Sequence, residues 1–250
     1  MIITIYVIIL IYLVYTSYPF IKQHYDLKEK VNLGEYKKIE ELEFNTGDII
    51  AFTAIMPYEY LVKRKNPSLF LAGSTFLRSS LYYLENHHYF HMATIIAHNG
   101  EFYAYDLSLT SRIDAFKNKI IKGAPIIFKL ADLYNYMGNI THYKYKGDKI
   151  NINLPALIKY VDSMDIKLVN YSSASDLLKV ILNNGLKIGK YNATDSKMVC
   201  TDFTEILLLE LGLVDELSKN ATAGSILDKL PNHYYNTILR TKYFDDIYLS

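Results

Sequence analysis

The sequence predicts an α+β protein in which a mainly antiparallel sheet packs against a central helix, preceded by an N-terminal transmembrane helix. Three observations predict this class. The first 21 residues carry no charged side chain. Short runs rich in β-branched and aromatic residues recur between positions 47 and 130. The stretch "CTDFTEILLLELGL", 200–213, is apolar on almost every face, which is typical of a buried helix.

Composition bounds the fold and excludes several classes of protein. Half of the 250 residues are hydrophobic, enough for one domain with a sizeable core after the first segment. Lys and Arg number 27 against 26 Asp and Glu, so the basic surface of a nucleic-acid-binding protein is missing and we expect no nucleic-acid partner. The single cysteine excludes an internal disulfide and multi-cysteine metal sites, and it favours a reducing compartment.

The apolar segment 1–21 has the length of a membrane span. At about 1.5 Å per residue it would form a helix of roughly 31 Å, close to the thickness of a bilayer's hydrocarbon core. A cleaved signal peptide is the rival interpretation, but no basic region precedes the apolar run and no small-x-small site follows it. A buried core helix is the other alternative. Five lysines follow between positions 22 and 38, so the positive-inside rule places the rest of the chain on the cytosolic side.

Residues 22–46 are charged and polar, and they predict a tether or short helix that leads to a domain spanning 47–250. The domain opens with "GDIIAF", a turn at Gly47-Asp48 followed by a strand at 49–53. Asp48 is expected to cap this turn, with lining of a cleft as the alternative. The following segment, 58–86, is predicted to be a mostly helical insertion or lid.

A hairpin follows in "HMATIIAHNGEFYAYDLS", 91–108, where Asn99-Gly100 is the strongest short-range signal for a type I′ turn. A two-residue turn pairs His98 with Glu101. Because side chains alternate between faces, His91 and Asp106 then become diagonal neighbours on one face of the sheet. The alternative is a surface histidine and an unrelated aspartate, and a one-residue bulge would also reverse the parity.

The remaining elements complete the predicted domain. A strand is expected at about 125–130 and helices at 154–165, 173–182 and 201–211. The four strands should form one sheet, with helix 201–211 on the face that carries His91 and Asp106. Histidines 87, 88 and 91 lack a thiol or carboxylate at ligand spacing, so we favour loop histidines over a zinc site and expect no metal.

Cys200 lies at the start of helix 201–211. Unpaired backbone N–H groups and the macrodipole at a helix N-terminus favour a thiolate over a thiol. The alternative is an inert buried cysteine, because free cysteine is among the most buried residue types.

The order "GDIIAF", "HMATIIA", "YAYDL" and "VCTDFTEILLLELGL" resembles the circularly permuted papain-like superfamily, which is related to the NlpC-type hydrolases. The nearest pattern is that of the YiiX/YaeF-like bacterial cysteine hydrolases and their viral relatives, with lecithin–retinol acyltransferase as a distant cousin. The resemblance covers roughly residues 47–230. It implies that Cys200 is the nucleophile, His91 the base, and Asp106 the carboxylate that orients the imidazole. The chain departs from the family pattern in having Thr201-Asp202 after the cysteine rather than Ser-Glu, and Asp106 rather than Glu.

The resemblance implies a thiol hydrolase or acyltransferase that cleaves an amide or ester. The apolar segment 1–21 and the short tether would anchor this enzyme to a membrane, so we expect a lipid or peptide-like substrate near the bilayer. Backbone N–H groups of Cys200 and Thr201 would hold the oxyanion, and no metal or organic cofactor is expected. Two alternatives stay open. One is a structural membrane protein, for example a virion component, that keeps the fold with a weakened triad. The other is a lipid-binding module that uses the same cleft.

Overall fold

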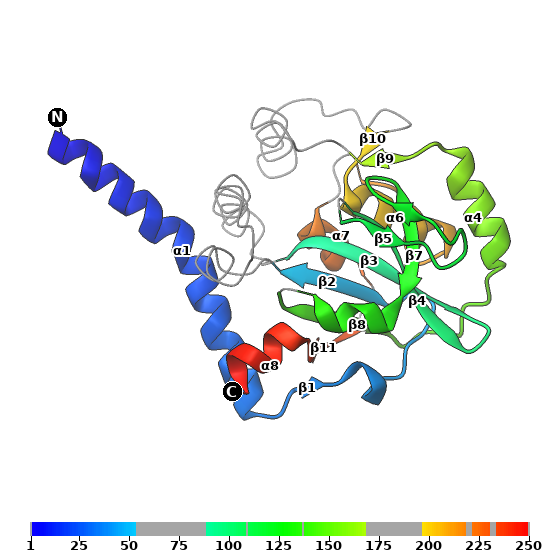
Figure 1. Ribbon diagram of the computed structural model, residues 1–250, viewed down its shortest axis with the longest axis horizontal. Helices are drawn as coiled ribbons and strands as arrows, with labels where there is room; N and C mark the ends of the chain where they lie inside the picture. Colours follow the sequence, from blue (N-terminus) through cyan, green and yellow to red (C-terminus); the bar gives the residue numbers. More distant parts are fainter. Residues whose placement is uncertain are drawn as a thin grey trace.

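The computed structural model describes residues 2–53, 89–108, 110–136, 138–168, 197–218, 222–230 and 234–249. These residues form a seven-stranded sheet with helices packed on it, and a long N-terminal helix extends away from it (Figure 1). The strand order is β1-β11-β8-β2-β3-β4-β7, and every neighbouring pair is antiparallel except β1 and β11. The α+β class and the mainly antiparallel sheet are therefore confirmed.

The four predicted strands are present as neighbours in this sheet, and three strands that were not predicted extend it beyond β2. The sheet consists of β1 (Tyr36–Lys37), β11 (Tyr234–Leu239), β8 (Ile140–Tyr145), β2 (Ile49–Thr53), β3 (Tyr89–His98), β4 (Glu101–Leu107) and β7 (Pro125–Lys129). Two small ribbons lie outside it, β5 (Arg112–Ile113) with β6 (Ile120–Ile121) and β9 (Lys167–Leu168) with β10 (Lys197–Met198).

The helices of the described residues are α1 (Ile2–Asn32), α4 (Leu154–Ser163), α6 (Cys200–Glu210), α7 (Ala223–Lys229) and α8 (Lys242–Tyr248), with 3₁₀ turns η1 (Ile39–Glu41) and η2 (Leu130–Asn135). Helices α4 and α6 match the predicted helices at 154–165 and 201–211. The helix predicted at 173–182 and the insertion predicted at 58–86 lie outside the described residues.

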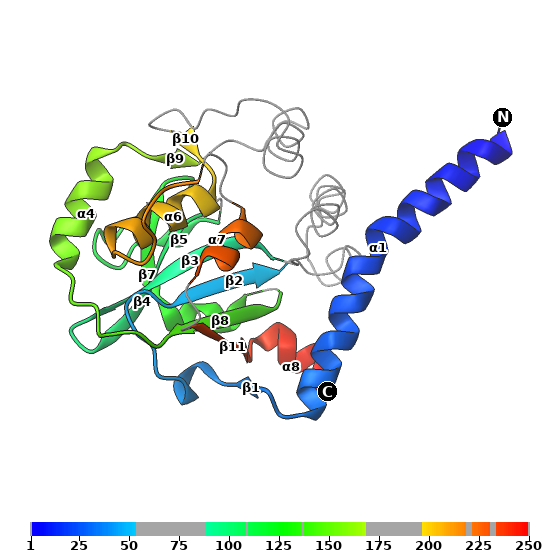
Figure 2. The same ribbon diagram turned by 180° about the vertical axis from the view of Figure 1, so that it is seen from behind.

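The two faces of the sheet carry different layers. Helices α6 and α7 cover one face, as Figure 2 shows from behind. There Phe203 of α6 packs edge-on against Tyr105 of β4, and the Thr204 hydroxyl donates to the carbonyl of Met92 in β3 at 3.2 Å. The other face packs against η1 and η2. Its core residues are Ile39, Phe44, Ile50, Phe52, Ala93, Ile95, Ala104, Ile126, Phe128, Leu130, Leu133, Ile140 and Leu239.

The predicted face for the cysteine helix was wrong. Met92 and Tyr105 belong to the core that α6 helps to form, whereas Ala93 and Ala104 belong to the opposite core. By strand alternation, His91 and Asp106 share the face of Ala93 and Ala104, away from the body of α6. The prediction failed because a helix that is apolar all round has no polar side to indicate which face of a sheet it covers.

Helix α1 does not end where the apolar segment ends. It continues to Asn32, and Leu27 is buried against Ile238 of β11 and Phe244 of α8, with Val31 packed beside them. The segment 22–46, expected to be a tether or short helix, thus contains the docked end of α1, then β1 and η1. The spacing of Leu27 and Val31, four residues apart, places both on one helix face and explains this docking.

The N-terminal part of α1 projects beyond the domain (Figure 1). Every side chain from Ile5 to Tyr15 is apolar or aromatic and more than two-fifths exposed. The transmembrane helix expected at 1–21 is not found: within the described part of the chain, no helix combines the length and the hydropathy of a membrane span.

Candidate active site

The turn between β3 and β4 sets the geometry of the site. Asn99 and Gly100 have φ values of 51° and 80°, the positive values that a type I′ turn requires, and His98 pairs with Glu101. The ladder continues to the pair Thr94 and Tyr105 without a shift. The predicted register of the hairpin is confirmed, and it brings the two candidate side chains at the far end of the hairpin together.

His91 and Asp106 form an ion pair. His91 Nε2 lies 2.8 Å from Asp106 Oδ1, and the two side chains are 15% and 3% exposed. Since Nε2 faces the carboxylate, the ring's other nitrogen, Nδ1, is the one left for a second partner. The diagonal contact expected from the hairpin register is therefore present in the structure.

The second partner of the His91 ring is Cys200, the only cysteine of the chain. Cys200 is the first residue of α6 and is buried, and its thiol forms a side-chain hydrogen bond with His91. Val199 is the N-cap residue, and its N–H donates to the Asp202 carboxylate at 3.1 Å, which fixes the first turn of the helix. The structure thus brings together the three residues that the resemblance implies.

The three groups meet although α6 lies on the opposite face from His91 and Asp106. In the β3–β4 register, the position opposite His91 is Ser108, and β4 ends one residue earlier at Leu107. The ring thus lies where the ladder stops, and the cysteine occupies the leading end of its helix rather than the packed body. A thiol that approaches the end of a strand can reach a side chain on the far face.

The charges around His91 control its protonation. Burial, the largest single effect, lowers the pKa of His91, but the charges of Asp106 and Cys200 and the hydrogen bonds with both outweigh it and raise the pKa to about 10. The ring is therefore an imidazolium at neutral pH. A cation between a carboxylate and a sulfur is the arrangement in which a thiolate is stabilised.

The start of α6 places backbone N–H groups beside the sulfur. The first N–H groups of an α-helix have no carbonyl partner in their own helix, and Cys200 and Thr201 are the first two residues of α6. An oxygen that develops negative charge beside the sulfur would meet these N–H groups and the positive end of the helix dipole.

Asp48 is a structural residue. Its carboxylate accepts the N–H of Asn45 at 2.9 Å and that of Tyr145 at 2.7 Å, and it lies 2.7 Å from His142 Nε2. The side chain of Asp48 is 0% exposed, so it caps its turn as expected and does not line a cleft. Sequence reasoning missed His142, because the strand "ITHYKY" has no signal that connects it with a turn almost a hundred residues earlier.

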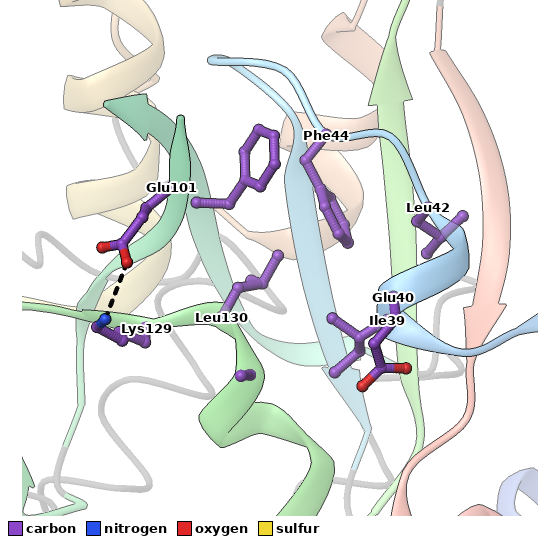
Figure 3. Close-up of a pocket in the computed structure, with 9 residues that line it drawn as sticks. Ile39, Glu40, Leu42, Phe44, Glu101, Lys129 and Leu130 are labelled. Carbon is purple, nitrogen blue, oxygen red and sulfur yellow. Dashed lines mark hydrogen bonds and ion pairs between the residues drawn. The ribbon is translucent and has the colours of Figure 1, made fainter. Parts of the chain in front are cut away.

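Two other kinds of site can be assessed in the described residues, a metal site and a groove. Among the described residues, no group of three His, Cys, Asp or Glu could hold a metal ion, and His87 and His88 of the zinc alternative lie outside them. A groove of about 410 Å³ lies near the tip of the β3–β4 hairpin (Figure 3), at the opposite end of β3 from His91. It is lined by Ile39, Glu40, Leu42, Phe44, Glu101, Phe102, Lys129, Leu130 and Ala131, and its rim carries the ion pair of Lys129 with Glu101.

Comparison with known proteins adds no family name to this geometry. No model of a protein family matches the chain, and no curated protein matches it. The chemistry of the site is therefore the basis for inferring a function.

Proposed function

We propose that the protein is a papain-like thiol hydrolase or acyltransferase with Cys200, His91 and Asp106 as its catalytic triad. The observation that carries the proposal is the placement of one imidazole ring between a buried carboxylate and the only thiol of the chain. Each role follows from its chemistry. A thiolate is the nucleophile, the imidazolium is its counter-ion and proton donor, and the carboxylate holds the ring.

The reaction has two halves. The Cys200 sulfur attacks the carbonyl carbon of an amide or ester, and the negative oxygen is stabilised by the N–H groups of Cys200 and Thr201. His91 then protonates the leaving amine or alcohol, which departs and leaves a thioester on the sulfur. Water or an amine, deprotonated by the now neutral His91, attacks the thioester and releases the sulfur as a thiolate.

The surface of α1 supports a lipid bilayer as the partner of the N-terminal segment. Eleven consecutive side chains from Ile5 to Tyr15 are exposed, so every side of this part of the helix is apolar. A protein groove covers one side of a helix, whereas lipid surrounds it. Attachment through this segment would hold the triad near a bilayer, which favours a lipid or a membrane-associated peptide as the substrate class.

The test of catalysis is acylation of the sulfur. The full chain in mild detergent is mixed with p-nitrophenyl acetate, an activated ester, and intact-mass spectrometry follows transfer of one acetyl group. We expect acetylation of wild type, none in Cys200→Ala, and a rate at least about tenfold lower in His91→Ala, because the thiolate loses its counter-ion. His98→Ala, on the same strand but outside the triad, is the matched control and should acetylate like wild type.

A folded wild-type protein that is not acetylated would contradict the proposal. That outcome would favour the alternative interpretation, a structural membrane protein that keeps the fold without turnover.

A further inference from the structure

The ring of His91 also packs against an aromatic side chain of the neighbouring strand β2. Phe52 of β2 is the cross-strand partner of His91, and the centroids of the two rings lie 5.0 Å apart at an interplanar angle of 44°. Phe52 is 2% exposed, so its ring has little freedom to move. An aromatic ring against an imidazole restricts rotation about the side-chain bonds of the histidine.

The pair formed by Phe52 and His91 lies beside a bulge in β3. Phe52 pairs with His91 but Thr53 pairs with Tyr89, so β3 has one extra residue at this point. Such a bulge re-aims the side chains beside it and is common next to active sites. The orientation of His91 therefore depends on how firmly the end of β2 is held.

Tyr136, in the segment between η2 and β8, holds the end of β2. Its ring packs edge-on against Phe52 with centroids 5.0 Å apart, and its hydroxyl donates to the Thr53 carbonyl at 3.0 Å. The neighbouring Gly138 leaves room for this contact. A Cβ at Gly138 would lie 2.5 Å from the Thr53 oxygen and 2.8 Å from the Tyr136 ring.

We propose that Phe52 and Tyr136 are positioning residues for the catalytic imidazole: Tyr136 fixes Phe52 and the end of β2, and Phe52 fixes the plane of His91. The inference rests on the proposed function, since it gives these residues a role in aligning Nε2 with Asp106 and the other ring nitrogen with Cys200. A purely structural role would make Phe52 equivalent to any other buried aromatic residue of the same core.

The experiment compares Phe52→Leu with Phe128→Leu in the full chain. Phe128 belongs to the same core and is 0% exposed, but it packs under Arg112 and not under His91. The readout is the rate of alkylation by iodoacetamide as a function of pH. Cys200 is the only cysteine, so the signal reports on this site alone.

We expect Phe52→Leu to slow alkylation near neutral pH by about tenfold and to displace the pH profile, because a misaligned imidazolium stabilises the thiolate less. Phe128→Leu should lose comparable thermal stability and keep the wild-type profile. Tyr136→Phe keeps the ring but loses the hydrogen bond to Thr53, and it should displace the profile in the same direction by less. This variant also serves as the test if Phe52→Leu does not fold.

Three outcomes separate a failure of the positioning role from a failure of the proposed function. If His91→Ala changes the alkylation profile while Phe52→Leu or Tyr136→Phe retains that of wild type, the positioning role is wrong and the triad stands. The positioning role is also wrong if Phe52→Leu and Phe128→Leu change the profile equally. If wild type and His91→Ala give the same profile, the proposed function itself fails.

Discussion

Asp106→Asn should remove a pH dependence of stability that the His91–Asp106 pair creates. The folded protein raises the pKa of His91 from 6.5 to about 10. A raised pKa in the folded state adds stability that is fully present below pH 6.5 and is lost as the pH rises through about 10. With Cys200 as a thiolate, the proton that the sulfur has lost offsets the one that His91 gains until the thiol of the unfolded chain ionises near about 8.5. Between about 8.5 and about 10 the folded state therefore binds one proton more than the unfolded chain, and the free energy of unfolding falls as the pH rises.

The expected magnitude follows from linkage. The slope is about 1.36 kcal/mol for each pH unit, and over the window from about 8.5 to about 10 the total is about 2 kcal/mol. Asparagine has almost the same shape but no charge, so the opposing effect of burial then dominates and His91 titrates at a much lower pH. Asp106→Asn should therefore be about 2 kcal/mol less stable than wild type near pH 8, with the difference narrowing towards pH 10.

Urea unfolding followed by circular dichroism across this pH range measures the effect, in one detergent for all variants. Asp114→Asn is the matched control. Asp114 is 1% exposed and accepts the backbone N–H groups of Phe116, Lys117 and Ile127. Its substitution should lower stability while leaving the slope between pH 6.5 and about 10 as in wild type. If the free energy of unfolding falls equally with pH in wild type and Asp106→Asn, the His91–Asp106 pair does not create this pH dependence.

Three further results are expected. Removal of residues 1–21 should make the protein soluble without detergent and leave its circular dichroism otherwise intact, because the exposed apolar part of α1 is lost; an unfolded aggregate would show that the segment belongs to the core. Gly100→Ala should cost about 1 kcal/mol in thermal unfolding through backbone strain alone, since a Cβ there meets nothing within 4 Å while φ is 80°; an unchanged melting temperature would contradict this. Lys229→Ala should cost about 1–3 kcal/mol, because it removes a cationic partner of the buried Glu205 carboxylate and leaves it the N–H and hydroxyl of Ser218; a cost within error would show that Ser218 suffices.

Local signals predicted much of the site. Asn99-Gly100 determines a two-residue turn, and the period of two along a strand then places His91 beside Asp106 without any knowledge of the rest of the fold. The start of α6 at Cys200 follows in the same way from the polar residues before an apolar run. Both predictions depend on residues close together in the chain.

The features that were missed depend on residues far apart in the chain. Strand β11 pairs antiparallel with β8 and parallel with β1, about two hundred residues away. Its sequence "YYNTIL" suits a strand, but nothing local assigns that strand to this sheet. The docking of α1 depends on Leu27 and Val31, whose charged neighbours made the segment read as a tether. The face of the sheet that α6 covers depends on which elements pack on the opposite face. The sequence of a helix that is apolar on every side does not indicate this.

The described part of the structure holds two buried histidine–aspartate pairs, and their surroundings assign them different roles. His142 is 1% exposed, and the Asp48 that it contacts is also occupied by two backbone N–H groups, so this pair ties β8 to the start of β2. His91 is 15% exposed, lies where β4 ends, and has a thiol as its second partner. In the first pair the carboxylate is occupied by backbone N–H groups and the imidazole is shielded from solvent, so a substrate cannot reach either group. The second pair lies at the end of a strand, is partly open to solvent and has a sulfur beside the imidazole. This nucleophile, rather than the presence of a histidine and an aspartate, identifies the candidate active site.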